Sequence, residues 1–249
     1  MNKQKTLKIM LILLIGVTLI LLFFVEYQKH YNSSNNTTTT KKEKNELFKI
    51  QNITYNHCKK ENDDNCKYVN NTLKHLKLTT EYDKLNDVIF QTNHYVDKKI
   101  KEIKDSNLNS NECSYVRETY NYRNIYMMSE FLYKSKEIIS ISYEIYGIDI
   151  CTNQNIEDTF NSYIYDIKNN KILTQNEIEN LYNIKDSTIN ETITNNLEYW
   201  NKELNTNYTL NDINNDYKLY LSSDGELSIF YKIKLLNKGY SAVIKEKTV

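Results

Sequence analysis

The sequence contains no proline, only four glycines and one tryptophan, and no excess charge of either sign. Its 32 basic residues equal its 32 acidic residues, so no net positive charge attracts a phosphate backbone, and nucleic acid is not expected as a partner. Codons for proline and glycine are GC-rich, whereas those for the abundant asparagine, lysine, isoleucine and tyrosine are AT-rich. The composition therefore indicates a low-GC bacterial genome and not a functional adaptation.

The sequence signatures of common enzymes are also absent. The chain has no G-x-S-x-G elbow, no H-E-x-x-H helix and no glycine-rich phosphate loop. Four histidines occur, and each has the sequence context of a surface residue: His30, His57, His75 and His94. Acidic pairs are too frequent on polar segments to single out a catalytic pair. We therefore expect no catalytic residue and no cofactor, with an enzyme of envelope polymers as the alternative.

Two short clusters imitate metal sites without matching them. Cys58 and Cys66 are separated by seven residues, with His57 as the adjacent imidazole, whereas zinc-binding cysteines usually follow a C-x(2–4)-C spacing. Residues 212–223 begin like a calcium loop but lack its glycine at the sixth position and its glutamate at the twelfth. No metal site is expected.

The longest apolar segment lies near the N-terminus. Ile9–Val25 (IMLILLIGVTLILLFFV) contains no charge, and Lys3, Lys5 and Lys8 precede it. As a helix it would extend roughly 26 Å, close to the thickness of a bilayer core of about 30 Å. The preceding lysines predict that residues 1–8 stay in the cytoplasm and that the rest of the chain is extracytoplasmic.

This pattern predicts four parts of the chain. A short cytoplasmic end (1–8) leads to a transmembrane signal anchor (9–26), which contacts the membrane through residues 9–25. A polar stalk (27–46) with almost no large aliphatic side chains follows. An extracytoplasmic domain then occupies 47–249, with a subdivision allowed near residue 110. A cleaved signal peptide is the alternative, but no small residues follow the apolar core.

All four cysteines follow the expected anchor: Cys58, Cys66, Cys113 and Cys151. An even number outside the cytosol predicts two disulfides, for which three pairings exist. We favour Cys58–Cys66, which brackets a polar loop, and Cys113–Cys151, which brackets two strand-like segments. Reduced thiols are the alternative, because some low-GC bacteria form few disulfides.

The hydrophobic pattern predicts an α+β fold, with an antiparallel sheet packed with two or three helices after the transmembrane helix. Strands are expected at 47–55, 67–78, 113–127, 137–151, 160–168, 217–221, 227–235 and 240–245. Helices are expected at 82–104, after a capping box formed by Thr174 and Glu177, and along 189–204.

The two longest strands do not align in a simple hairpin. If 113–127 pairs with 137–151 around a turn at 132–135, Tyr122 falls on the face opposite to Ile145, so a bulge or different neighbours are needed. Alternate tyrosines of the first strand give a candidate binding surface: Tyr115, Tyr120, Tyr122 and Tyr126. Packing against the sheet face is the alternative role for these side chains.

The order of the segments resembles the RsiV-like family. This is the extracytoplasmic domain of the membrane anti-sigma factor RsiV, which is shared with the N-terminal region of the peptidoglycan deacetylase PdaC. The resemblance lies in YDKLNDVI (82–89), EIISISYEIY (137–146), SYIYDIKNNKILTQNEI (162–178) and KLYLSSDGELSIFYKI (218–233). It implies a membrane-tethered binding or sensing domain whose ligand is a cell-envelope component such as peptidoglycan, or a protein such as lysozyme.

The chain departs from the family in two ways. Residues 147–159 read GIDICTNQNIEDT, where the family often has a Gly-Gly-Ala-His stretch. Neither a cytoplasmic segment that could hold a sigma factor nor a separate deacetylase domain is expected. The resemblance therefore favours the binding role over both of those activities. A structural or adhesive surface protein is a further alternative.

Overall fold

The computed structural model divides the chain into two units, Met1–Lys44 and Asn45–Val249, and all residues described below belong to the second. These are residues 47–53, 57–59, 73–80, 82–106, 108, 113–114, 116, 119–214, 216–236 and 238–244. The expected anchor and stalk, Cys66 and Tyr115 lie outside them. Across these ranges no helix is long and apolar enough to cross a membrane.

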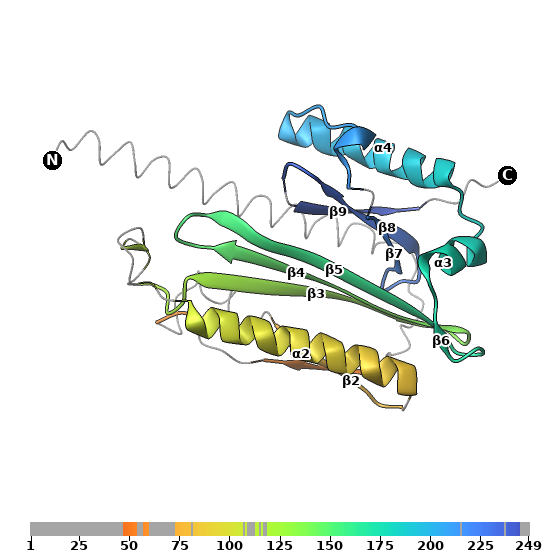
Figure 1. The fold of residues 1–249 in the computed structure, drawn as a ribbon, viewed down its shortest axis with the longest axis horizontal. Helices are drawn as coiled ribbons and strands as arrows, with labels where there is room; N and C mark the ends of the chain where they lie inside the picture. Colours follow the sequence, from red (N-terminus) through yellow and green to blue (C-terminus); the bar gives the residue numbers. More distant parts are fainter. Residues whose placement is uncertain are drawn as a thin grey trace, which may run out of the picture. The chain divides into compact units, whose positions relative to one another are not determined.

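The described residues form an α+β fold with three antiparallel sheets and three α-helices, which confirms the expected fold class (Figure 1). One sheet pairs β1 (Phe48–Asn52) with β2 (Lys74–Leu78), and the largest has the order β3 (Asn124–Lys134), β4 (Ile138–Asp149), β5 (Gln154–Asp166) and β6 (Lys171–Ile172). The third contains β7 (Lys218–Leu221), β8 (Leu227–Ile233) and β9 (Lys238–Val243). The helices are α2 (Asp83–Asp105), α3 (Gln175–Leu181) and α4 (Asp186–Leu204).

The central strand β4 is buried on both faces because a layer covers each side of its sheet. Figure 1 shows α2 and β2 along one face of this sheet, and β7–β9 with α4 on the other. Ile139 and Ile141 pack with Leu85 of α2, whereas Ile138 packs with Ile229 of β8. The alternating direction of side chains along a strand therefore sends odd-numbered β4 residues into one core and even-numbered ones into the other.

Polar side chains also join the two large sheets. Ser142 of β4 is fully buried, and its hydroxyl lies 3.0 Å from that of Ser162 on β5. The Ser162 hydroxyl donates to the carbonyl of Leu219 on β7 over 2.8 Å. Beside this link, four aromatic rings fill the space between the sheets: Phe131, Phe160, Tyr220 and Phe230. Ser142 thus satisfies its buried hydroxyl across the interface, whereas the buried Ser140 hydroxyl of the same strand has no partner among the described residues.

The helices follow the pattern of the sequence. In α2 the buried positions recur at helical spacing, and the helix lies within one residue of each expected end. The expected capping box at the start of α3 is confirmed, because the Thr174 side chain accepts from the Glu177 N–H while Glu177 accepts from the Thr174 N–H. Helix α4 begins at Asp186 and ends at Leu204, and its C-cap residue Asn205 has a left-handed φ of 51°.

The expected strand at 113–127 is wrong over most of its length. Strand β3 begins at Asn124, and among the described residues of 113–123 the β pairing is limited to an isolated bridge between Cys58 and Tyr120. The turn to β4 follows Lys134, so Tyr126 pairs with Gly147 and shares the α2-facing side of the sheet with odd-numbered β4 residues. The apolar faces of the two strands therefore align without a bulge between them. The shift arises because the real strand starts later and its turn lies later in the chain.

Candidate functional site

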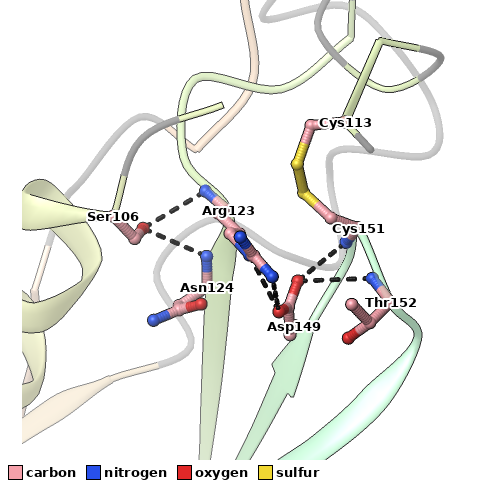
Figure 2. Close-up of a disulfide and its surroundings, with 7 residues drawn as sticks. All are labelled: Ser106, Cys113, Arg123, Asn124, Asp149, Cys151 and Thr152. Atoms are coloured by element: carbon pink, nitrogen blue, oxygen red, sulfur yellow. Dashed lines mark hydrogen bonds and ion pairs between the residues drawn. A yellow bond between two sulfur atoms is a disulfide. The ribbon is translucent and has the colours of Figure 1, made fainter. Parts of the chain in front are cut away.

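A disulfide fixes the turn between β4 and β5. Cys113 and Cys151 are buried and bonded, with their Cα atoms 4.9 Å apart, which confirms this predicted pair (Figure 2). Asp149 Oδ1 accepts from the backbone N–H of Cys151 over 2.9 Å and from that of Thr152 over 3.4 Å. Cys58 is also disulfide-bonded, and because Cys66 lies outside the described residues, its pairing with Cys58 stays a prediction.

An arginine holds the same aspartate from the other side (Figure 2). Arg123 approaches Asp149 Oδ2 with Nε at 2.8 Å and Nη2 at 2.6 Å. Burial raises the pKa of the Asp149 carboxyl, but the bonds from Arg123 and the two backbone N–H groups outweigh it and lower that pKa. The Ser106 hydroxyl, at the end of α2, accepts from the backbone of Arg123 and of Asn124. The β4–β5 turn is therefore tied to α2 as well as to the disulfide.

A cleft of about 450 Å³ opens beside this turn. Its walls come from β4, the start of β5, the end of α4 with its following loop, and β9 with the turn before it. The lining residues are Tyr146, Asn153, Asn155, Leu204, Thr206, Tyr208, Leu236, Lys238 and Tyr240. Such a mixture of rings, aliphatic groups and a few amides is typical of small-ligand sites.

The loop after α4 is held by one amide side chain. Asn201 Oδ1 accepts from the backbone N–H of Tyr208 over 2.7 Å and from the Thr206 hydroxyl over 2.9 Å. Its Nδ2 donates to the carbonyl of Tyr208 over 2.7 Å. Both ends of the cleft are thus preorganised, one by Asn201 and the other by the disulfide.

Tyr240 forms the floor of the cleft. It is 4 % exposed, and its ring lies 5.1 Å from that of Trp200 and 6.0 Å from that of Tyr231. The ammonium of Lys238 lies 5.6 Å from the Tyr240 ring centroid. Among the described residues, the buried Tyr240 hydroxyl has no hydrogen-bond partner. Burial raises its pKa to about 12, so this group stays a neutral donor.

Charged side chains lie behind the cleft, between the two large sheets. Burial, followed by the charge of Asp158, raises the pKa of Glu144 to about 7. Burial also raises the pKa of Asp158, although its Oδ2 accepts from the Gly239 N–H. The pKa of Lys238 is lowered by burial and supported in part by these two acids. Neither acid lines the cleft, so the pair is not placed to act on a bound molecule.

The described tyrosines of the predicted binding surface do not form one exposed face. Tyr126 is buried, and its hydroxyl donates to Glu102 of α2 over 2.8 Å. Tyr120 and Tyr122 are half-buried beside His57, with ring separations of 5.4 and 6.0 Å. Tyr126 therefore belongs to the interior, while Tyr115 lies outside the described residues.

The expectation that each histidine is a surface residue fails at His57. This side chain is fully buried, and burial lowers its pKa to about 4. His75 follows the expectation, since it is partly exposed and lies 2.9 Å from Asp97. His94 is exposed and stacks on Phe90. The bridge between Cys58 and Tyr120 places His57 beside the rings of Tyr120 and Tyr122, which cover it.

Sequence reasoning missed the cleft residues. Tyr146 belongs to a strand that the sequence predicts, but Tyr208 and Tyr240 lie some sixty and ninety positions further along. In a chain with 22 tyrosines, no single tyrosine stands out, and no spacing links these three. No family model and no curated protein matches the chain, so the site is interpreted from its geometry.

Proposed function

We propose that the chain is a membrane-anchored domain that faces outward from a low-GC bacterial cell and binds a component of the envelope in this cleft. The apolar run at 9–25 supports the anchor. The disulfide between Cys113 and Cys151 supports an oxidising location outside the cytosol. The resemblance to the RsiV-like family points to the same location and to a role in sensing the envelope.

The observation that carries the binding role is the preorganised cleft with its buried Tyr240 hydroxyl, which no described residue partners. A buried polar group without a partner is destabilising unless a water or a ligand completes its hydrogen bond. Asn201 and the disulfide hold the walls in position around it. These residues are therefore already held in place in the free domain, so less conformational entropy is lost when a ligand binds.

Binding fits the described lining better than catalysis does. The described lining contains no carboxylate, imidazole or thiol, and its lysine, Lys238, already interacts with Asp158 and Glu144, so the commonest general bases and nucleophiles are missing from it. Glu144 and Asp158 have raised pKa values, but they lie behind the lining residues. A concave site of about 450 Å³ also suits a small unit of a polymer better than the broad face of a globular protein such as lysozyme.

Co-sedimentation of the detergent-solubilised full chain with purified cell-wall material tests this proposal. The wild type is expected to sediment with the wall, and Tyr208→Ala, which removes one cleft wall, to lose at least tenfold in affinity. Tyr199→Ala is the matched control, because Tyr199 is 38 % exposed on α4 and is not part of the lining. Equal binding by Tyr208→Ala and the wild type would overturn the cleft as the site. Release of soluble wall fragments by the wild type would favour the enzyme instead.

A further inference from the structure

We infer that the cleft accepts one uncharged sugar ring of an envelope glycan, with the Tyr240 hydroxyl as a hydrogen-bonding group at its floor. This inference deepens the proposed function and rests on it. A sugar ring presents two kinds of surface, an apolar face of C–H groups and a rim of hydroxyl or acetamido groups. The cleft provides a matching partner for each kind.

The apolar part of the lining can contact the C–H face of a ring. Tyr146 and Tyr208 are half-buried on opposite segments, one from β4 and one from the loop after α4. Leu204 and Leu236 add aliphatic surface. The face of an aromatic ring carries partial negative charge and attracts the weakly positive C–H groups of a sugar.

The polar part of the lining suits groups that both donate and accept. Asn153 enters from the disulfide-anchored turn, Asn155 from the start of β5, where its Oδ1 already accepts from the Glu157 N–H, and Thr206 from the Asn201-held loop. Amides and hydroxyls offer donors and acceptors together, as the hydroxyls and amides of a sugar do. At the floor, the Tyr240 hydroxyl has almost no accessible surface and no partner within the described residues, so a ligand reaches it where a neighbouring lining side chain moves aside. A ligand hydroxyl placed there would complete its hydrogen bond.

The charge around the cleft favours a neutral sugar over a phosphate-bearing polymer. Lys238 is the only charged residue among those of the lining. Its ammonium interacts with Asp158 and Glu144, the two acids behind it. A phosphate or carboxylate that entered the cleft would meet the field of these acids as well as that of the lysine. Lys232 faces the same two acids, so the described charges behind the cleft nearly cancel and leave no strong attraction for an anion.

The tryptophan of the chain gives a direct readout of binding. Trp200 is the only tryptophan in the sequence, and its ring lies 5.1 Å from that of Tyr240. Titration of the full chain in detergent with the trisaccharide of N-acetylglucosamine is expected to change Trp200 fluorescence and to saturate in the millimolar range or below. Poly(glycerol phosphate) serves as the anionic comparison and is expected to give no saturable change.

Tyr240→Phe tests the role of the hydroxyl while it keeps the ring. It is expected to weaken trisaccharide binding about tenfold without lowering the melting temperature, because the lost group has no partner among the described residues of the free domain. Tyr182→Phe is the control, since Tyr182 is half-buried elsewhere in the core, and its affinity is expected to match that of the wild type. Unchanged affinity in Tyr240→Phe would overturn the assignment of the hydroxyl.

Two further outcomes separate this inference from the proposed function. If Tyr208→Ala abolishes wall binding but no neutral oligosaccharide titrates, or if only the phosphate polymer titrates, the sugar assignment is overturned and the cleft remains the binding site. If Tyr208→Ala leaves wall binding intact, the proposed function itself fails. Saturable binding of the trisaccharide that Tyr240→Phe weakens supports both.

Discussion

Replacement of Lys99 by methionine is expected to destabilise the domain severely, because it leaves the buried carboxylate of Glu157 without its paired cation. The ammonium lies 2.5 Å from Glu157 and 2.9 Å from Glu102, and its side chain is 8 % exposed. Burial alone would lower the pKa of Lys99, but its hydrogen bonds with the two glutamates outweigh this and raise it. The lysine is therefore charged in the folded domain, between α2 and β5.

The magnitude follows from what the substitution leaves behind. The Glu157 side chain is 12 % exposed, and with Lys99 removed it keeps the hydroxyls of Tyr95 and Thr159 as hydrogen-bond donors, but no other described cation pairs with it. Removal of one partner from a buried ion pair costs about 3–5 kcal/mol. For a domain of this size, such a loss lowers the melting temperature by about 6–20 °C.

Thermal and urea unfolding, followed by circular dichroism of the full chain in detergent, measures this effect. Lys98→Met is the matched control, since Lys98 is the neighbouring exposed lysine of α2, and a change within about 0.5 kcal/mol is expected. The double variant Lys99→Met with Glu157→Gln removes the stranded charge and should recover much of the loss. A cost below about 1 kcal/mol for Lys99→Met, or a double variant less stable than the single one, would refute the argument.

Three further predictions concern the site and its supports. Glu144 keeps its proton to about pH 7 in the folded domain, against an ordinary pKa of 4.5, so between these values rising pH lowers stability, by up to about 1.4 kcal/mol per pH unit. Glu144→Gln should remove that part of the slope in urea titrations at several pH values. Joint replacement of Cys113 and Cys151 by serine opens a loop of separation 38 and should cost about 4 kcal/mol by urea unfolding, whereas an unchanged midpoint would contradict it. Gly239→Ala places a Cβ 1.9 Å from the Phe230 ring and should cost about 1–3 kcal/mol in the same assay, so a neutral result would show that the ring can move.

Local patterns in the sequence were enough to predict several elements. The apolar spacing of α2, the Thr174–Glu177 box before α3 and the turn between β7 and β8 each depend on residues within a few positions of one another. Interactions between residues so close in the sequence contribute a similar free energy in almost any fold. For the same reason, the α+β class could be predicted from alternating and helical periods.

The register of β3 and the role of its tyrosines could not be predicted in this way. Tyr126 faces α2 because it pairs with Gly147, whose missing Cβ leaves room for the tyrosine ring. A shift of the pairing register by one residue reverses which tyrosines face outward. That start is set by Ser106, whose hydroxyl binds the first backbone groups of β3, and such a contact has no local signature.

The sequence by itself determined the class of the fold and its main helices, because periodicity and capping act along the chain, and among three possible cysteine pairings it favoured the bond of Cys113 with Cys151 that the structure contains. Only the tertiary structure decided where a ligand could bind. The cleft joins Tyr146, Tyr208 and Tyr240 from three distant segments, and it leaves the Tyr240 hydroxyl unpartnered among the described residues. A site of that kind depends on which faces of separate sheets meet, and that follows from packing across the whole domain rather than from any single stretch of residues.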